Sequence, residues 1–456
     1  MTATPHRQAT YCVRAAPRAV PHGRSRLAWY GPALVWMVSA VGSGSVLFTP
    51  RVAARYEYAL LWLALLTCAG MWIMIREAAR YTTVTGRTLL DGFDRLPGPR
   101  GWALWVIFVP QLVAAVVGVA GLSALVGSAG TVALGGPHWL YTLGLLGSAA
   151  GIVAFGEYDA LERVSRYMAM VLIALSVAAA LSVLPPPATL AAGLMPQIPT
   201  DFELAFVLPW VGTILAGSMG IVWFAYWTAT HGYGGASALS GEHHEDPELD
   251  ESGASEASHE RLAGWLRLVS RAALAAVVGG ACVIVAFNVL GAELLAPRGL
   301  IPSGTDVARD LARLLEGVWG AFGFWALIVL TVFALGGSVM ANQDGWSRSF
   351  ADITLLLLGA RRRPAWLTRR KLKRIYALGV TGLAPAVVYL AVRDPVAIMS
   401  WSGVVAAAHT PFIVLLIGWV NRAHLPRGLA PGPIATLFLA ATGMFYLLVS
   451  VLRFTV

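Results

Sequence analysis

Charged residues are scarce in this sequence, and their scarcity excludes several classes of protein. Asp, Glu, Lys and Arg make up 12% of the 456 residues, about half of the ~25% that is typical of a soluble chain. An ordinary cytosolic enzyme, a disordered protein and a nucleic-acid-binding module are therefore excluded. Hydrophobic residues make up 57%, and the mean hydropathy is +0.68. Since a transmembrane helix needs about 20 apolar residues, the chain has room for about ten of them.

Cysteine is also rare, and no motif of a common enzyme class is present. The three cysteines, Cys12, Cys68 and Cys282, have no metal-ligand spacing, which argues against a zinc site or a disulfide framework. The sequence contains no HExxH, Walker or dinucleotide-binding motif. Residues 216–220 resemble a nucleophile elbow, but that motif needs a strand–turn–helix context that an apolar span does not supply. We therefore expect neither an enzyme nor a bound cofactor.

Apolar segments bounded by charge, proline or glycine predict an all-α polytopic membrane protein with about eleven transmembrane helices. The expected spans are 27–49, 56–75, 102–126, 138–155, 166–184, 204–228, 268–294, 317–341, 375–392, 396–420 and 431–452.

The basic residues are distributed unequally between the two sides of these spans. The net charge is +9, and with the N-terminus inside, 26 of the 33 Lys and Arg lie in cytoplasmic segments and 7 in outer ones. Cytoplasmic loops of membrane proteins are enriched in Lys and Arg. We therefore expect a multi-pass protein of the cytoplasmic membrane, with a basic cytoplasmic tail at 1–26 and an outer C-terminus. Its expected partners are the bilayer and a small ion or solute, not nucleic acid, and a monomer is compatible with the sequence.

One cytoplasmic segment has the opposite charge. Residues 232–260 contain eight acids, three histidines and no basic residue, a composition that predicts disorder. A loose cation site at residues 243–246 (His-His-Glu-Asp) is one interpretation, and a solvated acidic loop is the favoured one, because nothing fixes a coordination geometry.

Glycine clusters interrupt two spans at corresponding positions. The first span contains Gly-Ser-Gly-Ser at 42–45, and the sixth contains Ala-Gly-Ser-Met-Gly at 216–220; each follows a proline, Pro32 or Pro209. Such a pair is typical of the broken helices of transporters with two inverted halves, although small residues also serve close helix contacts. The pattern fits two five-helix repeats, 27–184 and 204–420, followed by an extra helix at 431–452.

Several short motifs resemble those of the NRAMP (natural resistance-associated macrophage protein) family. They are GPAL (31–34), RYEYALLW (55–62), EAARYTTVTGRTL (77–89), EYDALERV (157–164) and GLMPQIP (193–199). The resemblance extends from residue 31 to about residue 420. It implies a LeuT-type fold of five plus five helices, and proton-coupled transport of a divalent metal such as manganese, iron or magnesium.

The resemblance also identifies where this chain departs from the family. The family's first helix has an Asp-Pro-Gly-Asn motif whose Asp and Asn bind metal, and Gly42 and Ser45 stand at those two positions. Met219 aligns with the Met of the sixth helix. His409, two residues before Pro411, takes the place of a metal-contacting Gln. The expected binding residues are thus Gly42, Ser43, Ser45, Ser218, Met219 and His409.

This candidate site contains no carboxylate, although divalent cations prefer oxygen ligands that include one. His409 is the strongest candidate for a binding residue, because an ionisable residue inside a span is functional by default. Its imidazole can ligate metal or take up a proton at about pH 6.5. Gln111 either faces the pathway or bonds a neighbouring helix. The alternatives to a metal carrier are a LeuT-type carrier of a small organic solute and a non-transporting sensor that uses the 232–260 loop.

A second polar group lies at the inner end of the eighth span. Asp344, Arg348 and Asp352 follow each other at intervals of four residues, which places them on one helical face. We expect an ion-pair ladder or an inner gate there.

Overall fold

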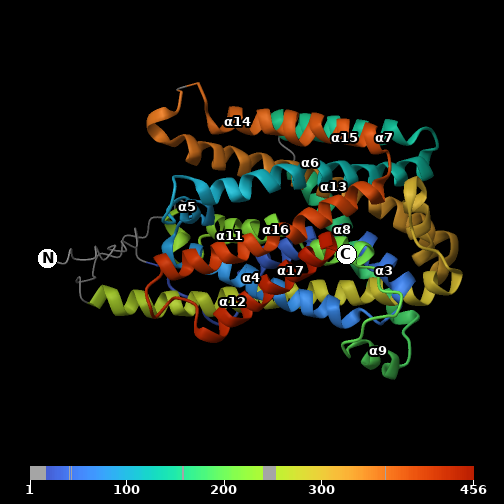
Figure 1. The fold of residues 1–456 in the computed structure, drawn as a ribbon, viewed down its shortest axis with the longest axis horizontal. Coiled ribbons are helices and arrows are strands. Elements are labelled where there is room, and N and C mark those ends of the chain that lie inside the picture. The colour runs from blue at the N-terminus through green and yellow to red at the C-terminus, as the bar shows by residue number, and fades with distance from the viewer. Residues whose placement is uncertain are drawn as a thin grey trace.

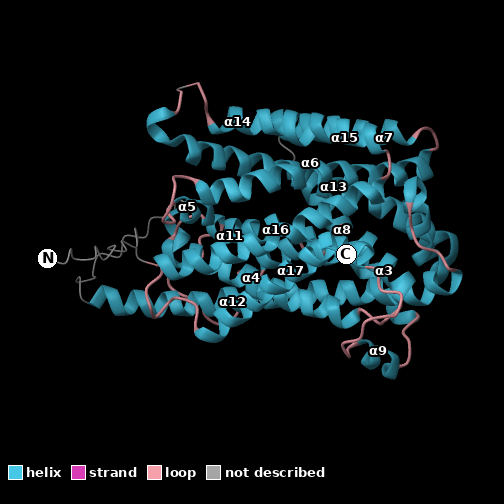
Figure 2. Ribbon diagram, in the orientation of Figure 1, coloured by secondary structure: helices cyan, strands magenta, loops and turns pink. Residues whose placement is uncertain are grey.

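The protein is a bundle of helices, most of which run along its long axis (Figure 1). The computed structural model describes residues 17–40, 42, 44–156, 159–239, 253–364 and 366–455, and these contain no strand (Figure 2). The α-helices are α1 Ser25–Ala28, α2 Gly31–Ala40, α3 Thr49–Tyr56, α4 Leu61–Thr85, α5 Leu89–Asp94, α6 Trp102–Leu134, α7 His138–Phe155, α8 Asp159–Ser182, α9 Pro187–Gly193, α10 Leu204–Thr213, α11 Ser218–Thr230, α12 Gly253–Leu290, α13 Val307–Arg362, α14 Arg369–Ile375, α15 Ala384–Val392, α16 Pro395–His424 and α17 Pro433–Thr455. Short π- and 3₁₀-helices are η1 Gly44–Phe48, η2 Gly234–Leu239, η3 Gly291–Leu295, η4 Ala296–Arg298, η5 Gly304–Asp306 and η6 Tyr376–Leu383.

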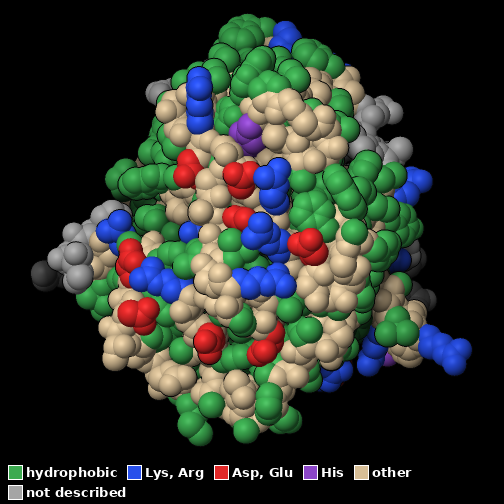
Figure 3. Space-filling view, turned by 90° about the vertical axis from the view of Figure 1, so that its right-hand side faces the viewer, with side chains coloured by type: hydrophobic (Ala, Val, Ile, Leu, Met, Phe, Trp, Pro, Cys, Tyr) green, Lys and Arg blue, Asp and Glu red, His purple; other side chains and the backbone are tan. Residues whose placement is uncertain are grey.

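The predicted spans agree with the helices of the structure. Ten helical segments in the described parts of the chain are long and apolar enough to cross a membrane, and the first predicted span corresponds to α2, η1 and α3, which are individually too short. Hydrophobic side chains surround the end of the bundle seen in Figure 3, and charged side chains of both signs lie nearer its middle. The all-helical, membrane-spanning fold is therefore confirmed.

Two spans are interrupted, and the interruptions touch each other. We call α2, η1 and α3 together helix 1, and α10 and α11 together helix 6. A Cβ atom at Gly44 of helix 1 would lie 2.1 Å from the carbonyl oxygen of Thr213, the last residue of α10. Since no side chain fits at that separation, the glycine permits direct contact between the two backbones at their breaks.

The break in helix 6 lies earlier than the sequence predicts. Residues 214–217 are non-helical, and Leu215 has a φ of 62°, so the break begins two residues before the glycine cluster at 216–220. Gly217 instead precedes the first turn of α11 as its N-cap. Gly220 lies inside α11, where a Cβ atom would be 2.4 Å from that of Ala216. Gly217 thus begins α11, and the missing side chain of Gly220 leaves room for Ala216 to pack against the first turn of that helix.

Other boundaries also differ from the prediction. Helix α12 begins at Gly253, so the end of the segment predicted to be disordered is helical, and η2 orders its beginning. Glu and Ala favour helix, and a preformed helix extends easily by one more turn. Residues 243–246 lie outside the described residues. Helix α13 is far longer than its predicted span and bends at Trp319–Gly320.

The site is positioned by α6, against which α13 and α16 both pack, while α10 packs on α16 and α11 on α4. Helix α5 and the start of α12 lie at one end of the bundle, and α3 and α9 lie at the other (Figure 1). By the charge distribution of the sequence we refer to these as the inner and outer ends.

Candidate functional site

Three buried polar side chains from three helices meet beside the start of α11. The amide nitrogen Nε2 of Gln111, from α6, lies 2.7 Å from the hydroxyl of Ser218 and 2.8 Å from Nδ1 of His409, from α16. The same Nδ1 is 3.3 Å from the Ser218 hydroxyl. All three side chains are at most 2% exposed. We call Gln111, Ser218 and His409 the polar triad.

The neighbours of the triad fix the direction of each hydrogen bond. The indole nitrogen of Trp346, which can only donate, bonds to Oε1 of Gln111 at 3.2 Å. The Gln111 NH₂ group then faces the other two members and donates to both. Since Nδ1 of His409 accepts, its Nε2 carries the hydrogen and donates to the carbonyl of Val106 at 3.2 Å. The hydrogen-bond network therefore holds a neutral imidazole.

A proline supplies the acceptor for this imidazole. In a continuous helix the Val106 carbonyl would accept from the backbone N–H of residue 110. Position 110 is Pro110, which lies inside α6 and has no N–H. The Val106 carbonyl is thus released from the helix, and His409 uses it.

Tryptophan and threonine side chains hold the two breaks. Thr49 donates to the carbonyl of Gly44 at 2.8 Å and accepts from the indole of Trp210 at 2.9 Å. On the other half-helix, the Trp36 indole donates to the Gly220 carbonyl at 3.0 Å. The two indole bonds thus connect helix 1 to helix 6 on both sides of the breaks.

The structure separates the residues predicted from sequence into two groups. Ser218 and His409 belong to the triad, and Met219 follows Ser218 in α11 and is 2% exposed. Gly42 and Ser45 lie at the break in helix 1, and the buried Ser45 hydroxyl has no hydrogen-bond partner among the described residues. Ser43 lies outside the described residues.

The residues assigned to this site that the structure describes include no carboxylate. Among the described residues, no group of three or more His, Cys, Asp or Glu side chains is placed to hold a metal ion. The fully buried Glu77 is neutralised by Arg76 at 3.0 Å and Arg80 at 2.5 Å. The oxygen and nitrogen donors around the breaks are therefore neutral.

The predicted ion-pair residues lie at the inner end and connect three helices. Asp344 pairs with Arg348 at 2.5 Å and with Lys373 of α14 at 2.7 Å. Asp352 pairs with Arg369 at 2.5 Å and accepts from the Tyr226 hydroxyl of α11 at 3.2 Å. The inner half of helix 6 is thereby tied to α13 and α14, a connection that i,i+4 spacing alone does not predict.

Arg51, at the outer end, was not among the site residues predicted from the sequence. A cavity of about 160 Å³ lies between α3, α10 and α16, and Arg51, Glu203 and Ser400 are among its lining residues. The Arg51 guanidinium stacks on Phe206 at 5.1 Å, and its buried Nε and Nη1 atoms have no hydrogen-bond partner in the part of the chain that the structure describes. The sequence does contain a signal for Arg51, because a charged residue stands only six positions after Ser45 and close to the interruption of the first span.

Comparisons with known proteins agree with this architecture. The family model described as natural resistance-associated macrophage protein-like matches residues 33–455. A divalent metal cation transporter MntH from Verminephrobacter eiseniae is 35% identical over 121 residues, which are 24% of this chain and 28% of that protein. The manganese transporter of Eremococcus coleocola, in a crystal structure with an aromatic bis-isothiourea compound, has a TM-score of 0.67 at 15% identity, covering 96% of this chain and 89% of that one. MhsT in complex with L-phenylalanine has a TM-score of 0.57 at 13% identity, covering 96% and 99%. Because the family model matches nearly the whole chain, this protein belongs to the Nramp family.

Proposed function

We propose that this protein carries a divalent metal cation across the membrane by alternating access, with the cargo bound between the breaks of helices 1 and 6. The observation that carries the proposal is the contact of Gly44 with the Thr213 carbonyl, beside the polar triad. Interrupted helices that meet in this way are where secondary transporters bind their cargo. Membership of the Nramp family and the transport of metal cations by the named relatives support the choice of cargo.

The uncharged ligand atoms around the breaks determine how a divalent ion is bound. Oxygen atoms of Ser45, Ser218 and Gln111, the Met219 sulfur and Nδ1 of His409 are the available ligands. A divalent ion stripped of its water here would lack a counter-charge, at a cost of several kcal/mol. We therefore expect manganese, iron or magnesium to keep part of its hydration shell.

His409 also offers a route to proton coupling. Its Nδ1 lone pair accepts from Gln111, so either a proton or a metal ion at Nδ1 must displace that amide. Proton and metal thus compete for one atom. In this mechanism protonation of His409 releases the cargo, and its deprotonation restores the ligand.

Uptake of Mn²⁺, Fe²⁺ and Mg²⁺ into proteoliposomes tests the proposal. We expect Ser45→Ala, Met219→Ala and His409→Ala to reduce uptake at least about tenfold, since each removes a ligand. Ser148→Ala is the control, because that exposed hydroxyl bonds only to its own helix. Unchanged uptake in all three variants would place the cargo elsewhere.

Two observations favour a small organic solute as the second candidate cargo. The described residues around the breaks include no group of three or more His, Cys, Asp or Glu side chains that could hold a metal ion, and Arg51 lines the outer cavity. The first turn of α11 presents backbone amides to the break, which suits a carboxylate of a solute. Uptake of a labelled amino acid without metal uptake would favour this candidate.

We also propose the arrangement of the chain in the membrane. Repeats 27–184 and 204–420 with an extra helix at 431–452, a cytoplasmic N-terminus and an outer C-terminus follow from the charge distribution. The Asp344–Arg348 pair and Asp352 then form part of an inner gate. Labelling of single cysteines by a membrane-impermeant thiol reagent on either side tests this orientation.

A further inference from the structure

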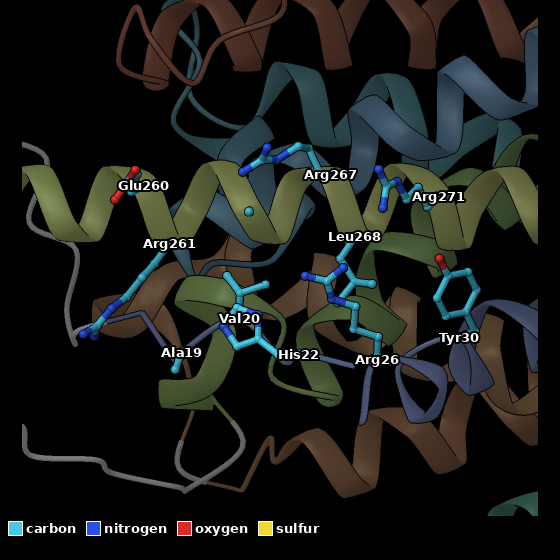
Figure 4. A pocket seen from close by; sticks show the side chains of 11 residues that line it. Ala19, Val20, His22, Arg26, Tyr30, Glu260, Arg261, Arg267, Leu268 and Arg271 are labelled. Carbon is cyan, nitrogen blue, oxygen red and sulfur yellow. The ribbon is translucent and has the colours of Figure 1, made fainter. Parts of the chain in front are cut away.

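We propose that a basic pocket at the inner end binds the phosphate group of an anionic ligand, at a place separate from the transport site. The pocket lies between the segment 19–30 and α12, and its volume is about 440 Å³ (Figure 4). Four arginines line it: Arg26 from the N-terminal segment, and Arg261, Arg267 and Arg271 from α12. This proposal does not depend on which cargo the protein carries.

The α12 side of the pocket is one face of a helix. Its lining residues fall at 260, 261, 264, 267, 268 and 271, a spacing of three and four that places them along a single stripe. Gly264 lies in the stripe, and a Cβ atom there would be 2.7 Å from the Val20 side chain. The glycine therefore allows the N-terminal segment to lie directly against α12.

Aromatic contacts fix the segment in place. The indole of Trp265, which is fully buried, donates to the carbonyl of Arg18 at 2.7 Å. Trp29 packs edge-on against Trp265 and Tyr233, with ring centroids 4.6 and 5.0 Å apart. The two walls of the pocket, more than 200 residues apart in the chain, are thus held together by a rigid cluster.

The pocket has an excess of positive charge. Its four arginines face one acid, Glu260, and His22 adds a further basic group. In the parts of the chain that the structure describes, Arg26, Arg267 and Arg271 form no ion pair. Guanidinium groups gathered without counter-charges repel one another. An anion would relieve that repulsion, and planar guanidinium forks suit the oxygens of a phosphate.

The length of α12 places the pocket near the membrane surface. Together with η3 and η4 it forms the candidate span Ser258–Arg298 of 41 residues, or ~60 Å of helix, about twice the thickness of the hydrocarbon core. The inner part of α12 therefore projects toward the headgroups, where lipids present phosphates, and basic pockets of this kind bind anionic headgroups. The apolar side chains of Val20 and Leu268 also line the pocket.

Binding to the purified full-length protein tests the proposal. The probes are short-chain phosphatidylglycerol, short-chain phosphatidylcholine and inorganic phosphate, and the readout is tryptophan fluorescence, because Trp29 and Trp265 support the pocket walls. We expect Arg267→Gln/Arg271→Gln to weaken phosphatidylglycerol binding at least about tenfold. The control is Arg370→Gln/Lys371→Gln, which removes two exposed charges at the same end. Arg26→Gln removes a pocket arginine from the N-terminal segment and should also weaken phosphatidylglycerol binding. This variant tests the proposal even if the α12 variant does not fold.

The outcomes separate the two sources of phosphate. Tight phosphatidylglycerol binding with weak binding of inorganic phosphate identifies a lipid site. Equal binding of both identifies a site for soluble phosphate compounds, and either result supports the proposal. Binding that is equal in the control, the Arg26→Gln variant and the unmodified protein would overturn it.

Discussion

His409 donates its Nε2 hydrogen to the Val106 carbonyl, the acceptor that Pro110 leaves without an N–H partner. One proline thus determines the tautomer of a histidine on another helix. With Nε2 occupied in this way, Nδ1 keeps its lone pair and faces Gln111 and Ser218. The imidazole is therefore held neutral and oriented before any cargo arrives, which is the form that a metal ligand needs.

The first prediction concerns this proline. In Pro110→Ala the new backbone N–H bonds to Val106 in the ordinary helical pattern and competes with His409 for that carbonyl, which weakens the His409 hydrogen bond. Since one hydrogen bond contributes about 1 kcal/mol, we expect uptake to fall about three- to tenfold while the protein remains folded. Proteoliposome uptake measures the change, and Pro187→Ala in the exposed α9 is the control. An unchanged rate would mean that the tautomer is set elsewhere.

Much of the fold is predictable from the sequence, because the bilayer imposes long apolar helices. The paired glycine clusters predicted the two interruptions, yet the break in helix 6 begins before its cluster. The non-helical residues are 214–217, Gly217 is the N-cap of α11, and Gly220 lies in its first turn. Composition indicates where a helix is weak, but the contact of Gly44 with Thr213, which fixes the break, joins residues far apart in the chain.

The second prediction compares two glycines in the same break. Gly44→Ala places a methyl group 2.1 Å from the Thr213 carbonyl, a backbone atom that cannot move alone, whereas Gly42 has no atom within 4 Å of an added Cβ. We expect Gly44→Ala to cost at least about 1–3 kcal/mol through overpacking and to abolish uptake. Gly42→Ala should be tolerated. Thermal unfolding and uptake of both variants measure the difference, and equal behaviour would contradict the contact between the breaks.

The third prediction distinguishes the two candidate cargoes. Arg51 lines the outer cavity and repels a cation that approaches helix 1, whereas it attracts an anionic solute. Arg51→Gln should therefore lower the KM for Mn²⁺ severalfold, most clearly at low salt, where the charge is least screened. For a carboxylate-bearing solute the same variant should raise the KM. Arg309→Gln, an exposed outer position, is the control.

The candidate site was only half predictable. Ser218 and His409 stand out because polar residues are rare in apolar spans, and family resemblance pointed to Met219 and His409. For Gln111 the sequence left two interpretations open, a position facing the pathway or a bond to a neighbouring helix. It could not decide between them, because the partners of Gln111 lie 107 and 298 residues away and no local pattern encodes the contact. The role of Trp346 in orienting the Gln111 amide could be found only in three dimensions.

The last prediction adds the carboxylate that the site lacks. Gly42 stands at the break in helix 1, and a Cβ atom added there meets no described atom within 4 Å, so the Cβ of Gly42→Asp needs no displacement of the described backbone. If the cargo is a divalent cation, the new negative charge should tighten Mn²⁺ binding at least about tenfold. Gly42→Asn, equal in volume but uncharged, should not do so. Calorimetric titration of both variants measures the affinities, and weaker Mn²⁺ binding by Gly42→Asp than by Gly42→Asn would contradict a cation site between the breaks.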